Sequence, residues 1–223
     1  STTFKEHTMS AILQDISEKL QKGKMKEVAE LVKQAVADGI QPLTILNEGL
    51  MPGMDIIGER FKKNDIFIPE VLIAARAMAA GTDVLRPLLV GDQMEEKGTV
   101  VIGTIKDDLH DIGKNLVIMM IESSGYEVID LGIDVSIEKF VQAAEDPDVT
   151  VVGVSALLTT TMVHIKDVVK GVAESPLAGK VKIMIGGAPV NDAFRESIGA
   201  DYYTPDASSA AEKALEICAA ARA

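Results

Sequence analysis

The sequence has few of the residues on which disulfide frameworks and thiolate metal centres depend. Its 223 residues include one cysteine, Cys218, and no tryptophan. A single cysteine excludes an internal disulfide framework and a metal centre built from several thiolates. Because this cysteine usage suits a reducing compartment, we expect a cytoplasmic protein.

Positive charge and long apolar runs are also scarce. Lysine and arginine number 22 against 34 aspartates and glutamates, which gives a net charge of −12. So acidic a chain repels a phosphate backbone, and nucleic acid is therefore not an expected partner. The sequence contains no apolar run of membrane-spanning length and no signal-like N-terminus, so we expect neither membrane insertion nor export.

The first 90 residues show helical periodicity and no strand pattern. Apolar residues recur at helical spacing, and the expected helices cover residues 10–20, 28–36, 42–61 and 69–79. Gly23 and Gly39 end the first two, and Pro52-Gly53 predicts a kink in the third. Four helices with short connections predict a four-helix bundle over residues 1–90.

A polar linker, residues 91–98, precedes a different pattern. Strand-like runs at residues 99–105, 127–131, 149–154, 181–185 and, weakly, 201–203 alternate with helical runs near 112–123, 136–145, 160–174, 190–198 and 207–221. Five such units predict a doubly wound α/β domain over residues 99–223, with a parallel five-stranded sheet and helices on both faces.

The loop after the first strand carries His110, between Asp108 and Gly113. It lies at the carboxyl end of a strand, where open α/β sheets bind ligands. An imidazole there can ligate a metal through one ring nitrogen, while Asp108 accepts a hydrogen bond from the other and fixes the tautomer. Gly113 leaves room for a bulky ligand. The loop alone is equally compatible with an ordinary helix start capped by Asp111.

Two further motifs follow the third and fourth strands, namely Ser155-x-Leu157 and Gly186-Gly187. Each has an ordinary interpretation on its own, as a helix start or a turn. Together with Asp108-x-His110-x-x-Gly113, however, they resemble the cobalamin-binding fingerprint, in the same order and at similar spacing.

The first half adds to this resemblance. Gly58-Glu59-Arg60-Phe61, Phe67-Ile68-Pro69 and Ala74-Ala75-Arg76-Ala77-Met78 resemble the helical cap of the cobalamin-binding module of methionine synthase. Nearly the whole chain is similar to the corrinoid proteins of anaerobic methyltransferase systems.

The resemblance implies a cofactor, cobalamin or a related corrinoid, bound with its own base displaced from cobalt. It implies that His110 is the lower axial ligand of cobalt, that Asp108 accepts the other imidazole N–H, and that Thr161 completes a proton relay. Thr161 stands where methionine synthase has a serine. The implied cofactor-binding set is Asp108, His110, Asp111, Ile112, Gly113, Ser155, Leu157, Thr159, Thr161, Gly186, Gly187, Tyr203, Asp206 and Ala207, with Phe61 and Ile68 from the cap. Phe61 and Ile68 have an alternative interpretation as plain bundle core.

The implied function is that of a methyl carrier without independent catalytic residues. It accepts a methyl group on Co(I) from a donor methyltransferase. It then passes the group from methyl-Co(III) to an acceptor methyltransferase that serves a thiol or a tetrahydropterin. A reductive activase is a third expected partner. The sequence leaves the donor open among methylamines, quaternary amines, methanol and methoxylated aromatics.

Three alternatives share parts of the pattern. A subunit of an adenosylcobalamin-dependent mutase has the second domain but does not usually carry the cap. A cobalamin-based sensor or repressor has both, together with a DNA-binding domain and a tryptophan-containing cap motif, whereas this chain has no tryptophan and no basic segment. A response-regulator receiver needs an aspartate after the third strand, where this chain has Ser155-Ala156-Leu157-Leu158.

Overall fold

The computed structural model describes residues 2–89 and 98–222, which fall into two compact units, Ser1–Glu96 and Lys97–Ala223. Apart from Gly98, the predicted linker 91–98 lies outside the described residues. Each unit is described by itself. Within the described ranges, no helix combines the length and apolarity needed to cross a membrane.

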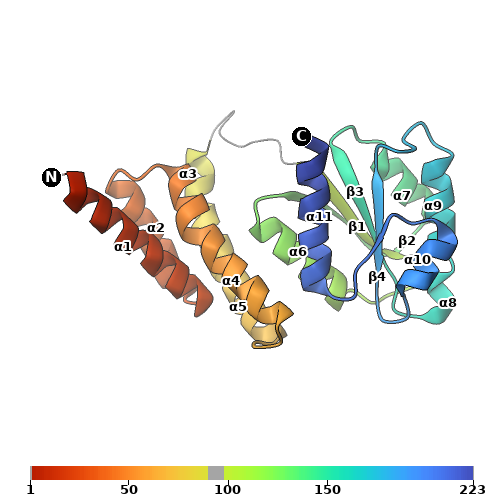
Figure 1. The fold of residues 1–223 in the computed structure, drawn as a ribbon, viewed down its shortest axis with the longest axis horizontal. Helices are drawn as coiled ribbons and strands as arrows, with labels where there is room; N and C mark the ends of the chain where they lie inside the picture. The colour runs from red at the N-terminus through yellow and green to blue at the C-terminus, as the bar shows by residue number, and fades with distance from the viewer. Residues whose placement is uncertain (1, 90–97, 223) are drawn as a thin grey trace. The chain divides into compact units, whose positions relative to one another are not determined.

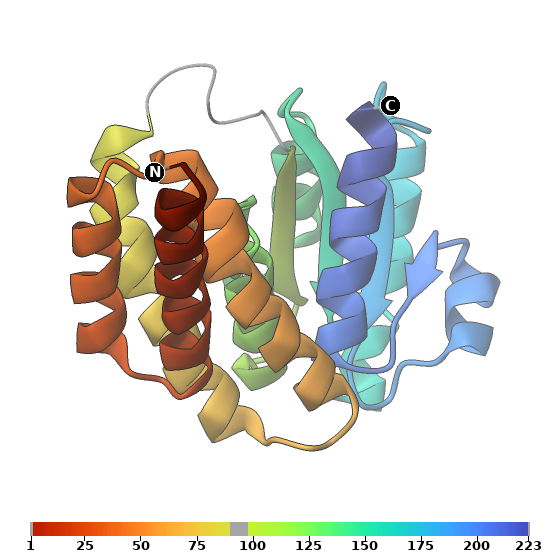
Figure 2. The ribbon, with the colours of Figure 1, turned by 60° about the vertical axis from the view of Figure 1, so that its left-hand side comes forward.

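The first unit is helical, as predicted. Its elements are α1 (Thr2–Gln21), α2 (Met25–Ala37), α3 (Pro42–Thr44), the π-helix η1 (Ile45–Leu50), α4 (Met51–Lys62), α5 (Ile68–Leu85) and the 3-10 helix η2 (Arg86–Leu88). The four longest helices pack side by side (Figures 1 and 2). Gly23 and Gly39 have positive φ angles and follow the ends of α1 and α2, where a left-handed residue favours glycine.

The predicted kink at Pro52-Gly53 takes the form of the π-helix η1, which ends two residues before the proline. Pro52 has no N–H to donate to an α-helical hydrogen bond. Directly before it the helix widens by one residue per turn, so that the Met51 N–H donates to the Leu46 carbonyl, five residues back. At Gly53 an added Cβ would lie 3.0 Å from the Ser17 carbonyl oxygen, so glycine allows α4 to approach α1 closely.

The second unit contains the predicted parallel sheet. Its strands are β1 (Thr99–Ile105), β2 (Glu127–Val135), β3 (Val149–Ser155), β4 (Lys182–Gly186) and β5 (Tyr202–Tyr203), in the order β2-β1-β3-β4-β5. All pairings are parallel. The helices are α6 (Ile112–Ser123), α7 (Ile137–Ala144), α8 (Thr159–Met162), α9 (Ile165–Ala173), α10 (Asp192–Ile198) and α11 (Ala207–Arg222). The predicted fold, an α/β domain after a helical bundle, is therefore confirmed.

The helices cover both faces of this sheet (Figure 1). On one face α7 and α9 pack a dry core in which Phe140, Val152 and Ile165 are fully buried. On the other face lie α6 and α11. Because the chain turns in opposite directions from β1 and β3, the carboxyl ends of these neighbouring strands form the point at which such sheets bind ligands.

In this second unit, two elements differ from the sequence-based expectation by more than an end residue or two. β2 continues to Val135 instead of ending near Leu131, through Gly132 and Asp134, whose positive φ angles are atypical of a strand. The single helix expected over residues 160–174 is divided into α8 and α9, with Val163 and His164 between them.

Candidate functional site

Asp108 is a fully buried carboxylate that accepts four hydrogen bonds. Its Oδ1 atom accepts from the backbone N–H of His110 at 3.1 Å and lies 2.8 Å from Nδ1 of the same residue. Its Oδ2 atom accepts from the Leu157 N–H at 2.8 Å and from the Thr161 hydroxyl at 2.6 Å. The loop after β1 is thereby joined to the loop after β3 and to α8.

These bonds decide the charge of Asp108. Burial raises the pKa of the Asp108 carboxyl, but the hydrogen bonds from Thr161, Leu157 and His110 together outweigh it and hold the pKa well below its usual range. Asp108 is therefore an ionised acceptor at neutral pH, and Nδ1 of His110 carries the proton that it binds. The lone pair for a metal is then on Nε2.

The local sequence explains why His110 projects from this loop. Thr104, near the end of β1, is fully buried and its hydroxyl donates to the His110 carbonyl at 2.7 Å. The Asp108 N–H donates to the Ile105 carbonyl at 3.1 Å and turns the chain immediately after the strand. The His110 side chain itself stays 51% exposed, so its Nε2 atom is accessible.

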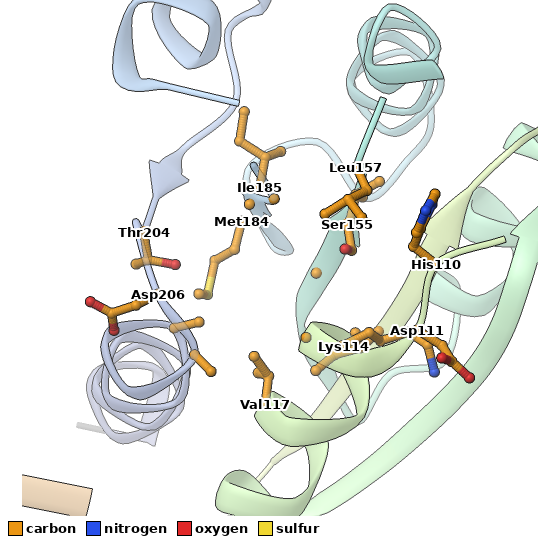
Figure 3. Close-up of a pocket in the computed structure, with 18 of the residues that line it drawn as sticks. His110, Asp111, Lys114, Val117, Ser155, Leu157, Met184, Ile185, Thr204 and Asp206 are labelled. Atoms are coloured by element: carbon orange, nitrogen blue, oxygen red, sulfur yellow. The ribbon is translucent and has the colours of Figure 1, made fainter. Parts of the chain in front are cut away.

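A cavity of about 570 Å³ opens next to His110 on the α6–α11 face of the sheet (Figure 3). Alternate residues of three strands form its floor, namely Val100 and Ile102 from β1, Val151, Gly153 and Ser155 from β3, and Met184 and Gly186 from β4. One wall is α6, with Lys114, Val117 and Ile121; the other is α11, with Ala207, Ala210 and Ala214. A largely aliphatic slot of this size suits a sizeable organic ligand with few polar groups.

Three glycines border this cavity for different reasons. Gly187 has a φ angle of 121°, and an added Cβ would lie 1.7 Å from the Ala156 carbonyl oxygen, so the fold itself requires glycine there. At Gly186 the nearest atom to such a Cβ is the Thr204 carbonyl oxygen at 3.5 Å, an ordinary contact. At Gly113 an added Cβ would meet nothing within 4 Å. The protein's own packing therefore does not require Gly113, which borders open space at the cavity.

Most of the residues predicted from the sequence meet at this place. Those that line the cavity are His110, Asp111, Ile112, Gly113, Ser155, Leu157, Gly186, Gly187, Asp206 and Ala207. Asp108 and Thr161 lie behind His110 and act on it through hydrogen bonds.

Four predicted residues are placed elsewhere. Thr159 is exposed at the start of α8 and does not line the cavity. Tyr203 packs against the core on the opposite face of the sheet, because its place in β5 directs the side chain there, and Thr204 lines the cavity instead. Phe61 and Ile68 belong to the helical unit, where Phe61 is half-buried and Ile68 is 39% exposed. Neither is a buried residue of the bundle core.

Sequence reasoning missed several lining residues, among them Lys114, Val117 and Met184. The helical spacing of 114, 117 and 121 would have identified the α6 wall. The alternation along 151, 153 and 155 would have identified the floor, because alternate residues of a strand share one face.

Comparison with known proteins agrees with this geometry. Residues 98–215 match the family model described as the B12 binding domain, and residues 12–86 match a second model with the same description. The chain belongs to the B12-binding corrinoid protein family. The match over the helical unit also disfavours the mutase-subunit alternative, because such subunits do not usually carry this unit.

Curated relatives cover this corrinoid protein almost completely. Dimethylamine corrinoid protein 3 of Methanosarcina acetivorans is 38% identical over 209 residues, which make up 94% of this chain and 98% of the relative. Trimethylamine corrinoid protein 1 of Methanosarcina mazei is 40% identical over 187 residues, 83% of this chain and 87% of the relative. The crystal structure of the methanol:cobalamin methyltransferase complex of Methanosarcina barkeri contains a chain that matches with a TM-score of 0.84 and 31% identity, over 94% of this chain and 80% of that one.

The residues present fit a corrinoid. His110 offers one accessible imidazole nitrogen, which suits a metal that brings its remaining ligands in a macrocycle. Next to it, the aliphatic slot has room for an attached organic tail, and Ser155 places a hydroxyl within it. A corrinoid makes use of both features, because its metal can take one nitrogen ligand from the protein and its organic tail needs an apolar slot.

Proposed function

We propose that this corrinoid protein carries a methyl group from a donor methyltransferase to an acceptor methyltransferase. When bound, the corrinoid supplies a cobalt ion that takes up the methyl group and gives it up. The observation that carries the proposal is the Asp108 carboxylate, which accepts four hydrogen bonds. It holds His110 so that the Nε2 lone pair is accessible at an apolar slot. The cytoplasmic location expected from the cysteine usage is part of this proposal.

His110 would be the lower axial ligand, and Asp108 would set how strongly it binds. The ionised carboxylate would orient the ring through Nδ1–H and leave the Nε2 lone pair for the metal. A proton that His110 takes up in the absence of the metal would go to Nε2. Since the pKa of Asp108 is so far below neutrality, Asp108 does not take up that proton. The proposed relay therefore acts electrostatically, with Thr161 and Asp108 as fixed partners and His110 as the group that gains and loses a proton at Nε2.

The slot would hold the displaced nucleotide tail of the cofactor. Ser155 would donate its hydroxyl to a nitrogen of the terminal base, while Leu157 and the aliphatic floor exclude water. Gly186 and Gly113 would leave room for the ligand, since neither is needed for the packing of the protein itself. Phe61 and Ile68, which the bundle does not bury, are the residues of the helical unit that we propose to contact the cofactor.

We further propose a methylamine as the methyl donor. Support comes from the curated relatives, which are named for dimethylamine and trimethylamine and of which this chain covers 98% and 87%. The solved methanol methyltransferase complex supports the more general point that a methyltransferase is the partner. An acceptor methyltransferase that serves a thiol or a tetrahydropterin, and a reductive activase, complete the proposed set of partners.

The test is methyl transfer to the purified, cobalamin-loaded and reduced protein. Each candidate donor, namely dimethylamine, trimethylamine and methanol, is supplied with and without its purified donor methyltransferase. We expect the absorption change of cofactor methylation only when a methylamine and its methyltransferase are both present. Methylation by methanol and its enzyme alone would contradict the donor assignment. Turnover of any donor by this chain without a partner would contradict the carrier assignment.

A further inference from the structure

The end of β2 contacts the His110 loop at the point where the loop begins. The Asp107 N–H donates to Oδ1 of Asp134 at 2.8 Å, and the Asp134 N–H donates to the Asp108 carbonyl at 2.9 Å. A single residue of β2 thus bonds to the peptide group before the Asp107–Asp108 peptide and to the peptide group after it. No motif in the sequence points to Asp134.

The same stretch of β2 contacts the chain again where the loop has entered α6. Nζ of Lys114 lies 2.8 Å from Oδ1 of Asp130 and 2.7 Å from Oδ1 of Asn115, and only 2% of the Lys114 side chain is exposed. Burial raises the pKa of Asp130, but the bonds from Lys114 and from the Gly132 N–H outweigh it and lower the pKa. The contact is therefore an ion pair at neutral pH.

The backbone of β2 departs from a regular strand in order to make these contacts. The pairing of β1 with β2 shifts register between Ile102 and Gly103 and again before Ile105. Asp107 and Asp134 both have left-handed φ angles, of 67° and 48°. Such angles are disfavoured outside glycine and persist where the surroundings determine them, often at functional sites.

We propose that Asp134 and the Lys114–Asp130 pair are positioning residues for His110. Asp108 is then held on two sides, its carbonyl by Asp134 and its carboxylate by Leu157 and Thr161. The side chain of Asp108, which orients the imidazole, would then keep its position whether or not His110 is bound to the metal. This inference rests on the proposed ligand role of His110 and adds that the strength of ligation depends on β2.

The test compares Asp134→Ala with Asp134→Asn, because asparagine keeps an oxygen acceptor for the Asp107 N–H. Each variant is loaded with cobalamin and reduced to Co(II), and the fraction with axial histidine nitrogen is read from the hyperfine splitting in electron paramagnetic resonance. We expect the ratio of ligated to unligated histidine to fall about three- to tenfold in the alanine variant, as for the loss of one hydrogen bond. The asparagine variant should stay near the wild-type value.

Asp146→Ala is the matched control, since Asp146 also accepts a hydrogen bond from a backbone N–H, that of Asp148 at 2.9 Å, in the turn before the amino end of β3, at the opposite end of the strand from the site. It should not change the ratio. In the cofactor-free protein, hydrogen exchange of the Asp107 amide should accelerate in Asp134→Ala alone.

Lys114→Met tests the second contact, with Lys170→Met, which alters an exposed pair with Glu174, as its control. Methionine keeps the apolar stem and removes the charge. We expect the same loss of ligation in Lys114→Met and no change in Lys170→Met. These two variants decide the question if Asp134→Ala fails to fold. Unchanged ligation in correctly loaded Asp134→Ala and Lys114→Met would overturn the inference and leave the proposed function intact. Missing histidine splitting in the wild type would instead overturn the proposed function.

Discussion

The Thr161 hydroxyl lies 2.6 Å from Oδ2 of Asp108, and neither residue is accessible to solvent to any substantial extent. The hydroxyl also lies 3.0 Å from the Leu158 carbonyl. It has one proton, and the shorter distance assigns that proton to the carboxylate. A side chain in α8 thus stabilises the charge that orients His110.

Removing this hydroxyl should destabilise the protein. Thr161→Val leaves a buried carboxylate with one donor fewer, and we expect the free energy of unfolding to fall by about 1–3 kcal/mol. Thr161→Ser keeps the donor and should retain most of the wild-type stability. Urea unfolding of the three proteins at neutral pH measures the difference. Unchanged stability in Thr161→Val would contradict this role of the hydroxyl, and a loss in Thr161→Ser alone would assign the effect to packing of the methyl group.

Asp108 should make stability depend on pH in a defined direction. Its pKa is lower in the folded than in the unfolded chain, so its contribution is present above the unfolded pKa of about 4 and is lost as the pH falls through the folded pKa. Asp108→Asn should therefore lower the free energy of unfolding most near neutral pH. The difference in this free energy from wild type should shrink as the pH falls below about 4. Chemical unfolding at several pH values measures it. A difference that grows on acidification would contradict the assignment.

Gly113 and Gly187 should respond differently to alanine. Gly187→Ala places a Cβ against the Ala156 carbonyl at a positive φ angle, and we expect a loss of about 3 kcal/mol or more in unfolding free energy. Gly113→Ala meets no protein atom and should fold normally, yet bind cobalamin more weakly. Thermal unfolding and cobalamin titration separate the two effects. Normal cobalamin affinity in Gly113→Ala would show that the open space there is not used by the cofactor.

Phe61 provides a test of the cap. Because Phe61 is only half-buried, Phe61→Ala should lower the free energy of unfolding by less than the roughly 3 kcal/mol lost when a buried phenylalanine is replaced by alanine. We expect it to speed the photolysis of methylcobalamin held by the protein. Ile56→Ala, which truncates an exposed apolar residue of the same helix, is the control. A loss of stability with unchanged photolysis would favour a plain packing role.

The sequence predicted the fold where its periodicity was strong, and it missed what depends on tertiary contacts. The runs that became β1, β3 and β4 are continuous apolar segments, as buried parallel strands are. The end of β2 was missed because Gly132 and Asp134 usually mark turns, and only the pairing of an edge strand with β1 extends it. The division between α8 and α9 has no proline or glycine to mark it.

The candidate site was predictable to the extent that its motifs are contiguous. Asp108, His110 and Gly113 lie within six residues, and strand-end placement brought Ser155 and Gly186 to the same edge. Thr104 and Asp134, by contrast, act on the His110 loop through bonds that only the folded chain reveals. Tyr203 was misplaced because the sequence does not show which face of so short a strand each residue occupies.

The most direct test of the account is the identity of the nitrogen bound to cobalt. The protein is produced with [15N]histidine, loaded with cobalamin of natural isotope abundance, reduced to Co(II) and examined by electron paramagnetic resonance. If His110 is the axial ligand, the hyperfine lines split into doublets, and the splitting disappears in His110→Ala. Triplets in the labelled protein, or doublets that persist in His110→Ala, would contradict the assignment of His110.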